Sequence, residues 1–139
     1  MLEVKVMRAL FVSRHDLQPK QREILEELGV SEVIHIAKQV SVEEVIELAK
    51  SMKCDIIIPV LPLTMLMNLI PLAKKEGIKV WTWTMERKVI SLDEAEKFKA
   101  QGLTVDVDLT SGRAVVFIPK ALNEIEDIEI RTKTLWSSE

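Results

Sequence analysis

The first 84 residues of the chain repeat one pattern, in which a short apolar run rich in β-branched residues precedes a turn signal and an amphipathic segment. Such runs are typical of buried strands, and apolar residues spaced three and four apart are typical of helices. Strands that alternate with helices over short connections are joined by right-handed crossovers, which make neighbouring strands parallel. The pattern therefore predicts an α/β fold in which helices cover a mainly parallel sheet in three layers.

The predicted elements of this repeat have recognisable starts and stops. Pro19 suits the first turn of a helix, Ser41 and Glu44 form a capping box, and Gly29 and Gly77 mark helix ends. We therefore expect strands over residues 4–12, 31–36, 55–60 and 78–84, and helices over about 19–28, 42–52 and 62–76.

The pattern changes after residue 90, where Ser91 and Glu94 form a second capping box. A Thr-Ser-Gly turn then separates two alternating segments, which is typical of an antiparallel hairpin. The predicted elements are a short helix ending at Gly102, hairpin strands over 103–109 and 113–119, and a half-exposed final strand over 128–136.

These elements predict one α/β domain over residues 1–139. Residues 1–90 make its βαβ core, and residues 91–139 contribute a helix, a β-hairpin and a final strand that extend the sheet. We expect a Rossmann-like three-layer fold, with a mainly parallel sheet and an antiparallel, β-rich C-terminal extension.

Composition narrows the class of protein. A chain of 139 residues, 47% of them hydrophobic, is long enough to bury one core without cross-links. The single cysteine, Cys54, excludes an internal disulfide or CxxC motif and is predicted to be a core thiol.

Charges interrupt the apolar N-terminus and prolines split the apolar run 56–73, so we expect no membrane span and a cytoplasmic location. Abundant Lys, Glu and Ile with few Asn indicate a heat-adapted source.

Charge and motifs exclude further classes. A net charge of −3 and the lack of a basic helix argue against direct binding to nucleic acid. Residues 1–90 are nearly neutral, however, so a small anion could bind there. The sequence has neither the dinucleotide-binding nor the P-loop glycine motif, and with four glycines in all we expect no cofactor.

Polar side chains gather where the predicted parallel strands end, and ligands of open α/β sheets bind beyond the carboxyl ends of the strands. Lys38 and Thr64 also fall near these ends. The predicted ligand-binding residues are Ser13, Arg14, His15 and Asp16 after the first strand, His35 in the second, and Thr84, Glu86 and Arg87 after the fourth.

The segment from Ser13 to Asp16 leads into a helix and suits an anion, because free N–H groups and the helix dipole favour negative charge there. His15 beside Asp16 could also act as a base oriented by a carboxylate. The structural alternative is a capped turn with a solvated His15. The apolar neighbours of His35 favour a satisfied core or edge histidine, and Arg87 joins the site only if the first and fourth strands are neighbours.

Two other pairs of residues have both functional and structural interpretations. Asp106 and Asp108 share one face of a strand and could suggest a metal, but they more simply mark the solvent side of a hairpin, so no metal is predicted. Trp81 and Trp83 share a strand face. Packing under a helix is favoured there over an aromatic platform for a base.

The helix predicted over 62–76 is apolar nearly all round, more than one buried face requires. Either the C-terminal extension covers the remaining apolar surface or the helix is a subunit interface. We favour a homodimer through residues 63–73.

Four segments carry a resemblance to other proteins: FVSRHDLQPKQ (11–21), VLPLTMLMNLI (60–70), TMER (84–87) and IRTKTLW (130–136). On these segments the chain resembles uncharacterised Rossmann-like proteins encoded by plasmids and viruses of archaea and bacteria. The resemblance implies a mobile-element origin and the same fold, and it implies no activity because none is known for that group.

Two functions follow as hypotheses. The leading one is a non-enzymatic module of a mobile genetic element that binds a small anion, a nucleotide or a protein partner. The alternative is an enzyme acting on a nucleotide or phosphodiester, with His15 as general acid or base and with Arg14 and Arg87 stabilising phosphate charge.

Overall fold

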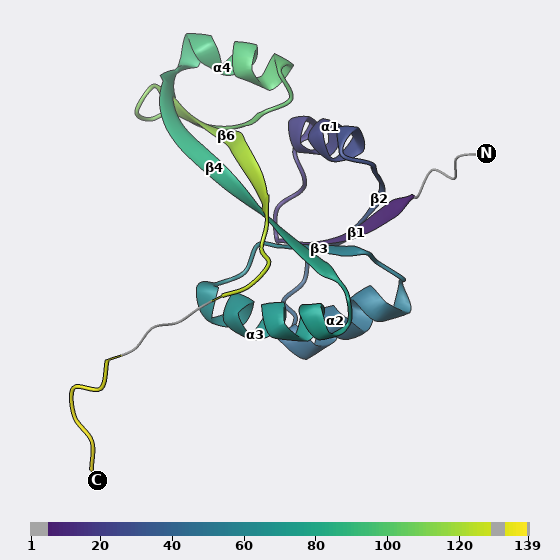
Figure 1. Cartoon of the computed structure of the whole chain (residues 1–139). Coiled ribbons are helices and arrows are strands. Elements are labelled where there is room, and N and C mark those ends of the chain that lie inside the picture. The colour runs from purple at the N-terminus through teal and green to yellow at the C-terminus, as the bar shows by residue number, and fades with distance from the viewer. Residues whose placement is uncertain (1–5, 129–132, 139) are drawn as a thin grey trace.

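The computed structural model describes residues 6–128 and 133–138, which form one mixed α/β arrangement (Figure 1). The predicted α/β character is confirmed. The strands are β1 (Met7–Val12), β2 (Val30–Ile36), β3 (Ile56–Pro59), β4 (Lys79–Ser91), β5 (Thr104–Asp108) and β6 (Arg113–Glu124), and the helices are α1 (Pro19–Glu27), α2 (Val42–Ser51), α3 (Leu63–Lys75) and α4 (Leu92–Ala100).

Both predicted capping boxes set the starts of their helices. Ser41 Oγ accepts a hydrogen bond from the N–H of Glu44 at 3.2 Å, at the start of α2. Ser91 Oγ accepts from the N–H of Glu94 at 3.4 Å, at the start of α4. Each serine satisfies a backbone donor that has no partner within its helix, so these starts could be located from the sequence alone.

The sheet has six strands in the order β2-β1-β3-β4-β6-β5. The pairings of β1 with β2, β1 with β3 and β3 with β4 are parallel, whereas those of β4 with β6 and β5 with β6 are antiparallel. Helix α1 lies on one side of the parallel strands, and α2 and α3 lie on the other (Figure 1). The chain therefore reverses its winding direction between β1 and β3.

Strand β4 differs from its prediction. It was expected to end at residue 84, but it continues to Ser91, because β6 pairs with it from Trp81 onward. Only Lys79 and Val80 pair with β3. Beyond them, β4 and β6 form a twisted ribbon that extends away from the parallel strands and carries β5 and α4 (Figure 1). We call this unit, residues 81–124, the arm.

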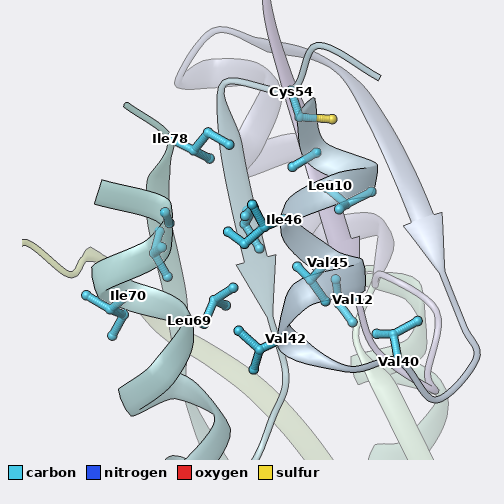
Figure 2. Close-up of a cluster of buried hydrophobic side chains, with 14 residues drawn as sticks. Leu10, Val12, Val40, Val42, Val45, Ile46, Cys54, Leu69, Ile70 and Ile78 are labelled. Atoms are coloured by element: carbon cyan, nitrogen blue, oxygen red, sulfur yellow. The ribbon is translucent and has the colours of Figure 1, made fainter. Parts of the chain in front are cut away.

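Buried apolar side chains form three clusters. The first lies between the parallel strands and the helices α2 and α3 (Figure 2). The second lies under α1 and includes Phe11 and Leu25, and the third lies under α4 in the arm. Cys54 belongs to the first cluster and is 7% exposed, so it is a core thiol as predicted. Burial raises the pKa of this thiol, and the charge of Arg8 partly opposes that effect.

The described residues beyond β6 include no further strand. Ile125 and Ile128 pack against the first cluster, residues 133–136 are not a strand, and residues 129–132 lie outside the described part. On α3 itself, Leu63 remains 67% exposed. A homodimer through this helix therefore stays a prediction. Every helix of the described residues is too short or too polar to cross a membrane.

Candidate functional site

Two cavities meet at the point where the winding of the sheet reverses. One is a groove of about 760 Å³ and the other a smaller pocket of about 340 Å³. Both are lined by Ser13 and His15, which follow β1, and by Val60 and Leu61, which follow β3. This is the crevice at which open α/β sheets bind ligands, because the helices after adjacent strands diverge there.

The smaller pocket is basic. Arg14, His15 and Lys38 line it, and all three residues are exposed. Within residues 6–128 and 133–138, neither Arg14 nor Lys38 forms an ion pair. Their charges are therefore available to an anion.

The start of α3 borders the same pocket through Pro62 and Met65. Pro62 is the N-cap residue, and its side chain accepts no hydrogen bond from the first turn. The N-terminus of α2, by contrast, is closed by the capping box of Ser41 and Glu44. Unsatisfied N–H groups and the positive end of the helix dipole both favour an anion at the start of α3.

His35 holds the turn that separates the two cavities. Its Nε2 lies 2.8 Å from the carbonyl oxygen of Ser13 and, because a carbonyl only accepts, Nε2 carries the proton. Its Nδ1 lies 3.5 Å from the carboxylate of Asp16, and its ring packs on Phe11 with centroids 5.1 Å apart. These contacts agree with the predicted structural interpretation of His35 as a satisfied core or edge histidine. They also show that Asp16 faces His35.

Within the turn, Ser13 Oγ accepts a hydrogen bond from the backbone N–H of His15 at 3.1 Å, while the N–H of Ser13 donates to Ile36 at 3.1 Å. The side chain of His15 has no hydrogen-bond or ion-pair partner among the described residues. A carboxylate that orients this imidazole, as expected of Asp16, is therefore missing from the described part of the chain.

The larger groove has mostly apolar walls with amide and hydroxyl groups among them. The parallel strands and α1 form one side of the groove, and the arm forms the other. The lining of the groove includes Phe11, Ser13, His15, Asp16, Gln18, Gln21, Thr82, Trp83, Met85, Thr104, Asp106 and Phe117. A volume of about 760 Å³ and this mixture of groups suit a small organic molecule.

Hydrogen bonds join the two sides at the groove. Gln18 Nε2 donates to the carbonyl of Phe117 in β6 at 3.0 Å, and Gln21 Nε2 donates to the sulfur of Met85 in β4 at 3.6 Å. A third bond, from the N–H of Lys20 to the carbonyl of Gly102 at 3.1 Å, ties α1 to the end of α4. The arm is thus tied to α1 by polar contacts, in addition to the packing of Trp81, Trp83 and Leu122 against the apolar cluster under α1.

Gln18 is the N-cap residue of α1 and is arranged with Gln21 as a capping box, in which Gln21 Oε1 accepts from the N–H of Gln18 at 2.9 Å. Two buried polar atoms of groove residues form no hydrogen bond within the described part of the chain: Gln18 Oε1, which lies at this helix start, and Trp83 Nε1. Gln18 is only 5% exposed. An unsatisfied buried polar group costs about 1–3 kcal/mol, so such groups are rare in native proteins and are normally paired with protein groups, water or a ligand.

The predicted site residues divide into two groups. Ser13, Arg14, His15, Asp16 and His35 lie together at the turn after β1, as expected from the ends of adjacent parallel strands.

The remaining three, Thr84, Glu86 and Arg87, line neither cavity. Because β3 lies between β1 and β4, the condition for Arg87 to join the site is not met. These residues lie within the long β4 rather than in a loop. Glu86 pairs instead with Lys120 at 2.9 Å, and the hydrogen bond and charge of Lys120 lower the pKa of its carboxyl group.

Four residues that line the two cavities were not among the predicted ligand-binding residues: Lys38, Gln18, Gln21 and Phe117. Lys38 was noted at a strand end, and its position beside Arg14 follows from the pairing of β1 with β2. Phe117 comes from a strand 99 residues after Gln18, so only the folded arm brings it to the groove. Trp83 packs against the second cluster, as predicted, and also lines the groove.

The described residues contain no group of three or more His, Cys, Asp or Glu side chains placed to hold a metal ion. Asp106 lines the groove, and Asp108 accepts a hydrogen bond from the N–H of Thr110 at 3.0 Å in the β5–β6 turn. Hydrogen bonds from Ser111 and Thr110 lower the pKa of Asp108. Both aspartates are exposed, the solvent-side position that the simpler interpretation expects.

No family model, no curated protein and no solved structure matches this chain.

Proposed function

We propose that the protein is a binding module for a small phosphate-bearing anion, and that the anion binds in the basic pocket at the end of β1, β2 and β3. The observation that carries this proposal is the convergence of Arg14, His15 and Lys38 around one pocket of about 340 Å³. Arg14 and Lys38 have no carboxylate partner among the described residues. An anion would therefore not have to displace an existing ion pair.

The chemistry of these groups suits phosphate better than a carboxylate. A guanidinium presents a planar fork of donors to two phosphate oxygens, and an ammonium adds a compact charge. The uncapped first turn of α3, next to the pocket, offers backbone donors to a third oxygen. A Rossmann-like arrangement of the parallel strands would explain why these groups meet at the reversal between β1 and β3.

A binding function is preferred to the enzymatic alternative. General acid–base catalysis by His15 requires a ring held in position, and no described side chain orients it. Arg87, the second residue expected to stabilise phosphate charge, lies outside both cavities. No observation on the described residues favours turnover, so we put forward binding alone.

Isothermal titration calorimetry with inorganic phosphate, at constant ionic strength, tests the proposal. We expect Arg14→Ala combined with Lys38→Ala to weaken phosphate binding at least about tenfold, because two charge-assisted contacts are lost. The matched control is Arg87→Ala combined with Lys88→Ala, which also removes two exposed cations. Neither residue lines a cavity, so this variant should leave affinity unchanged.

Two results would contradict the proposal. One is the absence of phosphate binding by the natural protein at millimolar concentration. The other is an equal loss of affinity in the control and the pocket variant, which would show that binding follows total charge rather than the pocket.

A further inference from the structure

We infer that the anion is the phosphate of a nucleotide whose base carries an exocyclic amino group next to a ring nitrogen acceptor, as adenine does, and that this base lies in the larger groove. The inference rests on the proposed function, since the phosphate would occupy the basic pocket. The inference adds a base to the phosphate-bearing ligand and names the protein groups that would recognise this base.

The two cavities lie side by side at the turn after β1. They share Ser13, His15, Val60 and Leu61, so the same four residues form the boundary of both. A molecule with a charged end and an apolar end can therefore place the first in the basic pocket and the second in the groove.

The groove suits the ring of such a ligand and does not suit a second anionic group. Phe11, Trp83 and Phe117 supply aromatic surface from both of its sides. Its charged lining residues are Asp16 and Asp106, with His15 at the boundary, so another phosphate would meet carboxylates there. Base–aromatic contacts are common means of holding nucleobases in protein sites.

The two atoms without a hydrogen-bond partner indicate which donor and acceptor groups the ring should carry. Gln18 Oε1 is an acceptor and requires a donor, whereas Trp83 Nε1 is a donor and requires an acceptor. The amino group of adenine donates and the adjacent ring nitrogen accepts, so adenine carries one group of each kind that these two atoms lack. Hypoxanthine has the opposite order at these two positions, with an oxo group that accepts and a ring N–H that donates.

Neither atom is open to solvent, so the walls of the groove must adapt when the ring enters. Met85 lies in the same wall, is 39% exposed and has an unbranched, flexible side chain. We expect displacement of this side chain to make room for the ring without a change in the strands.

The test compares inorganic phosphate, ribose 5-phosphate, AMP and IMP by calorimetry on the full chain. We expect AMP to bind at least about tenfold more tightly than IMP or ribose 5-phosphate, because a site with buried polar groups rejects analogues that leave them unpaired. Trp83→Phe, which keeps the aromatic surface and removes the N–H, should weaken AMP binding about fivefold to tenfold and leave phosphate binding unchanged.

Trp81→Phe is the matched control, because Trp81 lies on the same face of β4 but donates to Glu124 at 2.9 Å and does not line the groove. It should leave AMP affinity unchanged. If the variants fail to fold, as judged by circular dichroism, the comparison of AMP with IMP on the natural protein still decides the matter.

The outcomes separate the inference from the proposed function. Equal affinity for AMP and ribose 5-phosphate, with phosphate bound, would overturn the inference and leave the proposed function in place. Equal affinity for AMP and IMP would overturn the assignment of Gln18 and Trp83. Failure of all four compounds to bind would overturn the proposed function itself.

Discussion

The parallel strands and the arm bury their side chains in different ways. In β3, Ile56, Ile57 and Ile58 are fully buried, because α1 covers one face of the parallel strands and α2 and α3 the other. In the arm, α4 covers one face only, so Ile90 is 4% exposed while the adjacent Val89 is 62% exposed. The comparison shows that the candidate site lies where a rigid, doubly covered sheet meets a singly covered ribbon.

This difference has a consequence for binding. The basic pocket is built by the ends of the parallel strands, whereas the groove needs one wall from each region. Regions with few buried apolar contacts open locally at a lower free energy than the core does. We therefore expect the basic pocket to be the preformed half of the site and the groove to be the adaptable half.

The largest expected effect comes from matched core substitutions in the two regions. Ile57→Ala in β3 should lower the free energy of unfolding by about 4 kcal/mol, and Ile90→Ala in the arm by about 2 kcal/mol, because the thinner arm can relax around a cavity. Urea denaturation gives both values, and hydrogen exchange should show that Ile90→Ala exposes only arm amides. If both variants lost the same free energy of unfolding and both showed faster amide hydrogen exchange throughout the chain, the arm and the parallel strands would unfold as one unit.

A smaller effect is expected where the two regions touch. Gly102 has φ of +81°, and a Cβ there would lie 3.1 Å from the backbone nitrogen of Lys20 in α1. Gly77, after α3, has φ of +72° and open space around it. Gly77→Ala should cost about 1 kcal/mol from the left-handed backbone alone, and Gly102→Ala about 2 kcal/mol, because it also pushes the arm from α1.

Thermal or urea denaturation of the two glycine variants measures that difference. Faster hydrogen exchange at the N–H of Lys20, which donates to Gly102, should accompany only Gly102→Ala. If the two variants were equally destabilised, the contact between α1 and the arm would not contribute to stability.

The smallest effect concerns an ion pair on the arm. Lys120 holds the pKa of Glu86 below its usual value, so the pair stabilises the folded state above the unfolded pKa of about 4.3. This stabilisation is lost as the pH falls through the lower, folded-state pKa. Glu86→Gln should therefore be slightly less stable than the natural protein at pH 7, and the gap should close at lower pH.

Denaturation of both proteins between pH 7 and pH 2 checks this expectation. Asp108 also titrates with a lowered pKa, but it is common to both chains, so its contribution cancels in the difference. A gap that stayed constant over this pH range would show that Glu86 acts by packing rather than by charge.

The sequence predicted the parallel strands and their helices well because each carries its own local signal. The capping boxes at Ser41 and Ser91 mark helix starts, and the unbroken apolar run of β3 indicates a strand covered on both faces. The hairpin of β5 and β6 was also predicted, from its turn and its alternation. The end of β4 was missed, because Glu86, Arg87 and Lys88 are exposed charged residues that interrupt the apolar pattern, and this part of the chain becomes a strand only by pairing with β6.

The sequence by itself determined the α/β character, most element boundaries and the burial of Cys54, and it pointed to the turn after β1, which lines both cavities. Periodicity, caps and turns are properties of neighbouring residues, and so they can be read locally. Tertiary structure alone decided the strand order, which separates Arg87 from Arg14, and the return of β6, which brings Phe117 to Gln18. These contacts join residues far apart in the chain, and they arise from the burial of sheet faces that no local pattern specifies.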